Sequence, residues 1–333
     1  MRYDLFFVVV ANVRAISIDT IRAASRRIYP VVARTPLVRL DPLDRQFPEI
    51  LLKLEVFQPV GAFKIRGAMN AVARLTASEL RDGVWTVSAG NAALGLALAA
   101  REVGVPASVL VMDTAPHTKL DAIERLGATI VKAPYDECWA TVETGRSTRM
   151  GGRFIHPFDD DDFISGNGTI GLEILEDAPD VDAVVVPVGG GGLLAGVAAA
   201  LRHERPSAKI YAAEPETAAP LAASLAAGRP VHFENWTHSF VDGAGGKSVL
   251  PSMWPLLKDV VEESIVVSLK DAGAAMRQVA ERVHVIMEGA AACAVAAALS
   301  PAVRGRGHRR IVAIVSGGNI DLSQFASITV STI

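Results

Sequence analysis

Four consecutive glycines are the strongest sign of chemistry in this chain: Gly189, Gly190, Gly191 and Gly192. They directly follow an apolar run, 183–188, that predicts a strand, and they directly precede a segment, 193–201, that predicts a helix. Glycine lets backbone N–H groups converge on a phosphate, and the helix N-terminus adds partial positive charge. The run lacks the GK[ST] of nucleotide-hydrolysing loops and is no GxGxxG fingerprint. It therefore predicts a phosphate site, with a tight packing turn as the alternative.

Lys64 is the residue that could perform covalent chemistry. A lysine early in a helix is most often a solvated charge, but Lys64 has apolar neighbours, and Gly61 and Gly67 allow another group to approach closely. A buried lysine has a depressed pKa, which an imine-forming amine needs. Two further glycine loops, 88–91 and 316–319, also follow apolar runs. Because α/β sheets bind ligands at the carboxyl ends of their strands, the three loops predict one ligand with several polar parts.

The rest of the chain alternates between strand-like and helix-like segments. Ser17 or Asp19 can cap a first helix that ends at Ile28. Strands are expected at 51–56, 84–88, 107–112, 128–131, 183–188, 210–213 and 311–315. Helices are expected at 61–75, 118–126, 170–175, 193–201 and 290–299. A further helix is expected to follow Gly90 and to end at Val103. The repeated β-α-β order predicts an α/β protein with two parallel-sheet lobes.

Composition excludes several classes of function. The 333 residues are 50% hydrophobic, and the formal net charge is −3 without basic runs, which argues against nucleic-acid binding. The apolar run 6–11 is too short to span a bilayer, and no cleavage site follows it. Cys138 and Cys293 lie far apart and are interpreted as free thiols in a reducing compartment. We expect a cytoplasmic protein without a membrane segment.

The segments 58–68, 88–91, 189–192 and 316–319 resemble, in order and spacing, the signature blocks of the threonine/serine dehydratase and serine racemase family. These are fold-type II pyridoxal-phosphate enzymes with a tryptophan-synthase-β-like fold, and the similarity runs from about residue 18 to the C-terminus. It implies a large cofactor-binding domain, 14–52 plus 144–333. A small substrate-side domain, 53–143, would be inserted in it, and 1–13 would be an N-terminal extension.

The same resemblance implies the site residues. Lys64 would hold pyridoxal 5'-phosphate as a Schiff base and act as the catalytic residue, with the glycine run holding the phosphate. The implied cofactor-binding residues are Phe63, Lys64, Asn91, Gly189, Gly190, Gly191, Gly192, Glu288 and Ser316. Asn91 would bond to the phenolic oxygen, Ser316 would face the pyridine nitrogen and Glu288 would lie near the ring. The substrate carboxylate would lie against Ser88, Ala89, Gly90, Asn91 and Ala92.

Several positions depart from the family. Most members carry His and Gln where this chain has Ala92 and Leu94, and Ala62 replaces a common serine. These changes predict a less polar pocket that could take a phenylserine-like or hydroxyaspartate-like substrate. In members with a cation site, Glu214 matches a glutamate but Pro220 replaces an aspartate, so no metal is predicted.

Three functions remain open. The first is an ammonia-lyase that converts L-threonine, L-serine or a related 3-hydroxy-amino acid to a 2-oxo acid and ammonia. The second is an amino-acid racemase, and the third is a catalytically silent binder of the cofactor or of amino acids. Racemases of the family carry serine where this chain has Ala89, which favours the lyase. The expected partners are a small amino acid and further copies of the chain, as a homodimer or homotetramer.

Three polar features allow a structural interpretation. His156 is expected to be a turn residue rather than a general base. Asp242 is expected to shape a loop beside the cofactor. The acidic run 159–162 is expected to be a solvated loop rather than a cation site.

Overall fold

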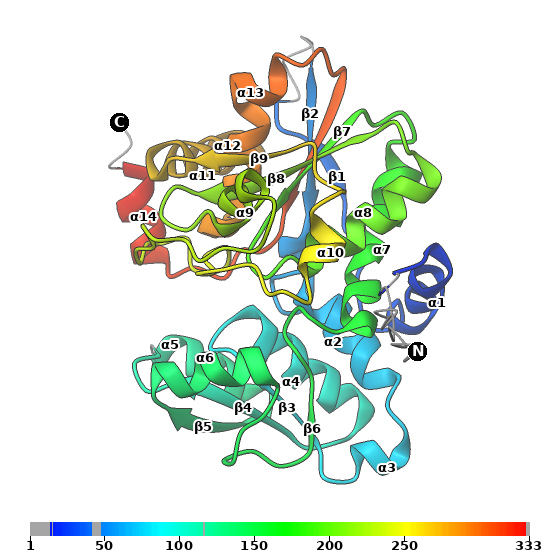
Figure 1. Cartoon of the computed structure of the whole chain (residues 1–333), viewed down its shortest axis with the longest axis vertical. Coiled ribbons are helices and arrows are strands. Elements are labelled where there is room, and N and C mark those ends of the chain that lie inside the picture. The colour runs from blue at the N-terminus through cyan, green and yellow to red at the C-terminus, as the bar shows by residue number, and fades with distance from the viewer. Residues whose placement is uncertain (1–13, 15, 42–47, 116, 331–333) are drawn as a thin grey trace, which may run out of the picture.

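Two sheets, drawn one above the other in Figure 1, organise the chain. The computed structural model describes residues 14, 16–41, 48–115 and 117–330. Within these ranges the larger sheet has the order β1-β2-β10-β7-β8-β9 and the smaller has the order β5-β4-β3-β6. The larger sheet contains β1 (Leu37–Arg39), β2 (Glu49–Leu54), β7 (Ala183–Pro187), β8 (Lys209–Pro215), β9 (Glu263–Val267) and β10 (Arg310–Val315). The smaller contains β3 (Val84–Val87), β4 (Ala107–Met112), β5 (Thr129–Ala133) and β6 (Arg153–Phe154).

The predicted α/β class with parallel sheets is confirmed. All strand pairs of both sheets are parallel except β1 with β2. This edge strand was not predicted. A parallel crossover needs a dozen or more residues, and the connection from residue 40 to 48 is shorter, so β1 can only pair antiparallel with its successor.

Helices cover both sheets. Those before β6 are α1 (Ile18–Ile28), the 3-10 helix η1 (Glu55–Phe57), α2 (Lys64–Ala73), α3 (Ala77–Leu80), α4 (Asn91–Val103), α5 (His117–Arg125) and α6 (Tyr135–Thr144). Those after it are α7 (Asp161–Asp177), α8 (Gly192–Glu204), α9 (Pro220–Ala227), α10 (Trp254–Leu257), α11 (Leu269–Val283), α12 (Gly289–Leu299), α13 (Pro301–Arg304) and α14 (Leu322–Val330). None of the helices within the described residues is both long and apolar enough to cross a membrane.

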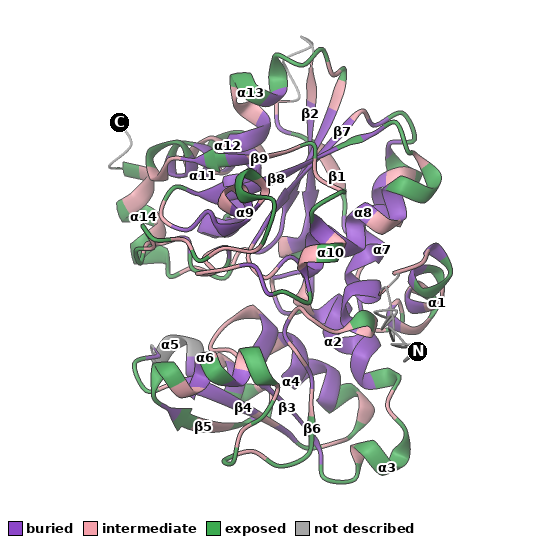
Figure 2. Ribbon diagram, viewed as in Figure 1, coloured by how far each residue is buried: buried purple, intermediate pink, exposed green. Residues whose placement is uncertain are grey.

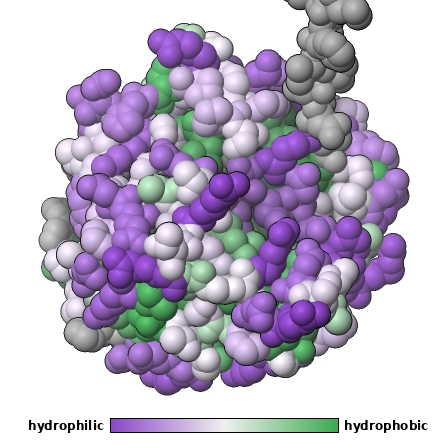
Figure 3. Space-filling view, turned by 60° about the horizontal axis from the view of Figure 1, so that its bottom comes forward, coloured by the Kyte–Doolittle hydropathy of each residue, from purple (hydrophilic) through white to green (hydrophobic). Residues whose placement is uncertain are grey.

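The larger sheet is buried on both faces. Along β7, Val184 and Val186 pack with α7 and α8, whereas Val185 packs with α11 and α12 on the opposite face. This alternation follows from the two-residue repeat of a strand, and burial on both faces explains why β7 is apolar throughout. Figure 2 shows the buried residues concentrated in these strands and in α7 and α8. In the space-filling view, hydrophobic residues appear between hydrophilic ones, not as one continuous surface (Figure 3).

Helices α2 and α7 have bounds that differ for a structural reason from the predicted ones, and α8 runs to Glu204 instead of residue 201. Helix α2 begins at Lys64 instead of residue 61. Gly61 has φ +70, and the N–H of Phe63 donates to the carbonyl oxygen of Ser316 at 2.9 Å, so these residues are bound to the end of β10 before the helix starts. Helix α7 is longer than the predicted 170–175 and begins at Asp161, after the N-cap Asp160, whose side chain accepts the N–H of Phe163. Helix α1 begins after Ser17, as one of the two predicted caps requires.

The domain boundaries stay a prediction. The range 53–143 contains β3, β4 and β5, but β6 (Arg153–Phe154) completes the same sheet from outside that range. With only two residues, β6 has too little sequence to be recognised as a strand.

Candidate active site

A cavity of about 530 Å³ lies where loops from both sheets meet. It is lined by residues that follow β2, β3, β7 and β10, which are carboxyl ends of strands. The predicted site residues all line it: Phe63, Lys64, Ser88, Ala89, Gly90, Asn91, Ala92, Gly189, Gly190, Gly191, Gly192, Glu288 and Ser316. Segments separated by more than 200 residues therefore share one cavity, while their individual roles stay predictions.

Lys64 is the first residue of α2 and is partly buried. Its Nζ donates to the carbonyl oxygen of Pro157 at 2.6 Å and lies 5.2 Å from the ring centre of Phe63. Burial lowers the pKa of Lys64 to about 8, although the carboxylate of Glu288 acts in the opposite direction. An amine with this pKa is neutral, and hence nucleophilic, in a much larger fraction of molecules near neutral pH than a solvated lysine.

The backbone holds Lys64 against the loop that follows β10. Ala62 forms an isolated bridge with Gly317, and the N–H of Gly318 donates to the carbonyl oxygen of Gly61 at 2.9 Å. A Cβ at Gly61 would lie 2.7 Å from Oδ1 of Asn319. Glycine at this position is therefore required both by its positive φ and by the close approach of the two loops.

Asn91 belongs to a chain of side-chain hydrogen bonds at the cavity. Its Nδ2 donates to Oε1 and Oε2 of Glu288 at 2.9 and 3.0 Å, and its Oδ1 accepts from Nδ2 of Asn319 at 2.8 Å. Asn319 also donates to the carbonyl oxygen of Val60. These bonds fix the side chain of Asn91 at the cavity, and its role toward the cofactor stays a prediction. Asn319 stands in the third glycine-bearing loop, but its bond to Asn91, 228 residues away, could not be predicted from the sequence.

The glycine run forms the turn into α8, with Gly191 at φ +89 as its N-cap. A Cβ at Gly190 would lie 2.2 Å from the ring of Phe158, and one at Gly192 would lie 2.5 Å from the carbonyl oxygen of the same residue. Close packing against Phe158 therefore requires glycine at these positions, as the alternative of a tight packing turn predicts. The first-turn N–H groups of α8 have no partner within the helix, and this end of the helix lines the cavity, so the loop also suits a phosphate.

The loop 88–91 forms the N-terminus of α4 at the same cavity, with Gly90 as the N-cap. The hydroxyl oxygen of Ser88 accepts the N–H of Gly90 at 3.1 Å, so this side chain is turned back onto its own loop. Two helix N-termini thus open on one cavity beside a lysine of lowered pKa. This arrangement suits a ligand with a phosphate and a carboxylate.

Arg66, two residues after Lys64, is the centre of a buried ionic network that the sequence did not reveal. Its guanidinium donates to Glu55 at 2.7 and 2.8 Å and to Glu173 at 2.6 and 2.9 Å. Lys53 lies 2.7 Å from the same Glu173, and all four side chains are buried. The network joins α2 to α7 and to the end of β2, and so holds the helix that carries Lys64.

The other polar features have structural roles. Nδ1 of His156 accepts the N–H groups of Phe158 and Asp159, and its Nε2 bonds to the carbonyl oxygen of Val142 at 3.0 Å, as expected for a turn residue. Asp242 lines the cavity. In the acidic run, Asp160 caps α7.

Glu214, the glutamate matched to the family's cation site, is buried. It accepts the N–H groups of Leu221 and Ala222 at the start of α9, each at 2.8 Å, and the hydroxyl of Ser264 at 2.6 Å. Its carboxylate oxygens therefore hold the beginning of α9.

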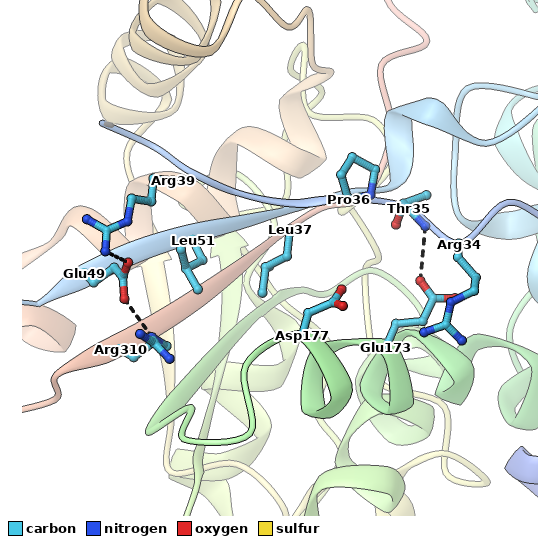
Figure 4. A pocket seen from close by; sticks show the side chains of 10 residues that line it. All are labelled: Arg34, Thr35, Pro36, Leu37, Arg39, Glu49, Leu51, Glu173, Asp177 and Arg310. Carbon is cyan, nitrogen blue, oxygen red and sulfur yellow. Dashed lines mark hydrogen bonds and ion pairs between the residues drawn. The ribbon is translucent and has the colours of Figure 1, made fainter. Parts of the chain in front are cut away.

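A second cavity, of about 590 Å³, lies along β1, β2 and α7 (Figure 4). Charged side chains line it, and three of them pair with one another. Glu49 lies between Arg39 and Arg310, and a carboxylate oxygen of Glu173 accepts the N–H of Thr35. None of the predicted site residues lines this cavity.

The fold and the first cavity define an α/β enzyme with a lysine at the ligand-binding ends of its strands. The chain belongs to the family described as pyridoxal-phosphate dependent enzymes, whose model matches residues 28–317. Pyridoxal 5'-phosphate is therefore its cofactor. The cavity fits this group, because it offers an amine of lowered pKa, a helix N-terminus for the phosphate and the hydroxyl of Ser316.

Relatives of two activities are similar to the chain to nearly the same extent. It is 39% identical to an L-threonine ammonia-lyase of Thermotoga maritima over 92% of this chain and 77% of that protein. It is 38% identical to a serine racemase of Oryza sativa subsp. indica, over 92% of each chain. The structure of maize serine racemase superposes with a TM-score of 0.84 at 35% identity, covering 96% of this chain and 98% of that one. These similarities support the family and leave the reaction to be argued from the site.

Proposed function

We propose that the protein is an ammonia-lyase: it eliminates water from an L-3-hydroxy-amino acid, and hydrolysis of the resulting enamine takes up one water and releases ammonia and a 2-oxo acid. When bound, pyridoxal phosphate supplies an electron sink for the charge that develops at the substrate Cα. In this proposal Lys64 binds the cofactor and its freed amine removes the Cα proton as a general base. Residues 189–192 and the start of α8 hold the phosphate, and residues 88–91 hold the substrate carboxylate.

The methyl group of Ala89, in the loop proposed to bind the substrate carboxylate, is the observation that favours a lyase over a racemase. Racemisation needs a proton-exchanging group on each face of the substrate, because one group returns the proton only to its own side. A methyl group cannot exchange protons. The neighbouring hydroxyl, that of Ser88, is bonded to the N–H of Gly90 in the same loop. In elimination the Cα proton is removed on one face alone and is not returned to the other, so Lys64 suffices as the base at Cα and elimination fits this loop better.

Replacing Ala89 with serine should raise the rate of racemisation relative to elimination, because it adds a hydroxyl where the loop now has a methyl group. We expect the ratio to rise by roughly 10-fold or more, as positioned acid–base groups contribute at least that factor. The measurement is pyruvate release together with chiral analysis of the remaining serine. Ala77→Ser, which adds a hydroxyl at an exposed position of α3 that does not line the cavity, is the control and should leave the ratio near that of the unchanged enzyme.

The proposed function is tested on the unchanged holoenzyme with L-serine, L-threonine and larger 3-hydroxy-amino acids. Formation of 2-oxo acid and ammonia in equal amounts, with little D-isomer, supports the lyase. Interconversion of D- and L-serine as fast as pyruvate release would identify a racemase instead. A protein that binds pyridoxal phosphate but turns over none of these amino acids would be the silent binder.

A further inference from the structure

One wall of the active-site cavity is apolar. Leu94 of α4, Met112 of β4, Trp139 and Val142 of α6, and Phe158 before α7 all line it. Each of these side chains is partly exposed, unlike the surrounding core. Four of the five come from the half of the molecule that contains the smaller sheet, whereas the glycine run comes from the larger sheet. The wall thus lies mainly on the side of the smaller sheet, and Phe158 joins it to the predicted phosphate loop.

Trp139 presents carbon surface to this cavity. Its one hydrogen-bond donor, Nε1, is bonded to a carboxylate oxygen of Glu143 at 3.0 Å in the same helix. What remains for a ligand is the face and edge of the indole ring, which favour apolar and aromatic groups. The position of α6 is fixed by the bond between His156 and the carbonyl oxygen of Val142.

The wall is continuous with the loop that would hold the substrate carboxylate. Leu94 lies one helical turn after Gly90, and its N–H donates to the carbonyl oxygen of that residue at 3.2 Å. Ala92, between them, also lines the cavity and is buried. A substrate bound at residues 88–91 therefore has small and apolar residues beside the position from which its side chain extends.

We propose that the substrate is a 3-hydroxy-amino acid whose C3 carries a hydrocarbon group larger than methyl, of which 3-phenylserine is the representative. The inference rests on the proposed lyase function and adds its substrate class. Removing such a group from water against Leu94 and Trp139 is favourable, whereas the hydrogen and methyl group at C3 of serine and threonine cover little of this wall.

The test is the kcat/KM of the holoenzyme for 2-oxo acid release from L-threonine, 3-phenylserine and 3-hydroxyaspartate. We expect 3-phenylserine to exceed threonine by about 10-fold or more, since each added apolar contact in a pocket contributes a factor of this order. Trp139→Ala should lower kcat/KM for 3-phenylserine by about 10-fold or more and change that for threonine by less than about 3-fold. Trp139→Phe, which keeps an aromatic ring, should retain most of the preference and shows that loss is not misfolding.

Tyr135→Ala is the matched control, because Tyr135 is an aromatic residue of the same helix that does not line the cavity. It should leave the preference unchanged. Leu94→Gln should move the preference toward threonine, because it places an amide in the wall. The inference is overturned if threonine or 3-hydroxyaspartate is the better substrate, or if Trp139→Ala affects all substrates equally. Failure of every substrate to yield a 2-oxo acid would overturn the proposed function as well.

Discussion

Replacing Lys64 with methionine should abolish turnover. It should also raise the free energy of unfolding of the cofactor-free protein. The first effect follows because methionine offers neither a nucleophile nor a base. The second follows because the native state holds this ammonium group partly buried and, within the described residues, without an ion pair. Methionine has a similar length and no charge, so it removes that penalty.

The pKa of Lys64 sets the size and the pH window of the stabilisation. Its value is lowered from 10.5 to about 8, so between these pH values the unfolded chain binds more protons than the folded one. The stability of the unchanged protein therefore rises with pH across this window, and the penalty is complete below about pH 8. At one unit of pKa per about 1.4 kcal/mol, Lys64→Met should stabilise the protein by at most about 3 kcal/mol at pH 7.

The measurement is denaturant unfolding of both cofactor-free proteins at pH 7 and pH 10. The difference between them should shrink at the higher pH. Lys132→Met, on the exposed side of β5, is the control and should leave stability nearly unchanged at both pH values. A Lys64→Met protein that keeps activity, or that is less stable at pH 7, would contradict the assignment.

Replacing Arg66 with methionine should have the opposite effect on stability. Arg66 is fully buried and pairs with Glu55 and Glu173, so its loss leaves two buried carboxylates without their principal partner. Breaking a buried pair in this way typically destabilises a protein by about 3–5 kcal/mol. The two substitutions, two residues apart in one helix, thus have opposite predicted effects on stability, because Arg66 pairs with two carboxylates whereas Lys64 forms no ion pair among the described residues.

The pH dependence of the Arg66 effect is also predicted. Burial alone would raise the pKa of Glu173, but Arg66 and Lys53 hold it below its usual value. The carboxylate therefore contributes stability above the pKa that it has in the unfolded chain, and this contribution is lost as the pH falls through the lower, folded pKa. The difference between Arg66→Met and the unchanged protein should be largest near neutral pH and smaller in acid.

Arg74→Met provides the matched control in denaturant unfolding. Arg74 ends the same helix and pairs with Asp162 at the surface, where such pairs contribute about 0–1 kcal/mol. If Arg66→Met destabilised the protein no more than Arg74→Met, the network would not be what holds α2.

Part of this structure could be read from the sequence because its signals are local. A run of glycines after an apolar strand marks a turn into a helix, and the cap at Ser17 and the strand at 107–112 are likewise set by neighbouring residues. The three glycine loops lie at carboxyl ends of strands, where parallel sheets place their ligand sites. That rule predicts that the loops 88–91, 189–192 and 316–319 share one site, whereas Glu288 was expected there only from the family resemblance.

Other features depend on contacts between distant segments. The predicted range 170–175 is too short for α7 because Gly166 and Gly168 lower the helix propensity of its first half. A Cβ at Gly166 would lie 2.3 Å from the carbonyl oxygen of Arg66, and one at Gly171 would lie 2.8 Å from Cβ of Ala200. These glycines are there so that α2 and α8 can approach α7. The position of Trp139 in the cavity wall could not be predicted from the sequence either, because only the fold brings α6 to the active site.

The most direct test of the central claim is to locate the bond between the protein and its cofactor. Borohydride should reduce that bond in the holoenzyme to a stable amine, and peptide mass spectrometry should then find the pyridoxyl group on Lys64 alone. Lys53 is the closest alternative in sequence, but its Nζ is buried 2.7 Å from a carboxylate oxygen of Glu173 and should carry no label. A label on Lys53 or on any other lysine, with Lys64 unmodified, would contradict the account.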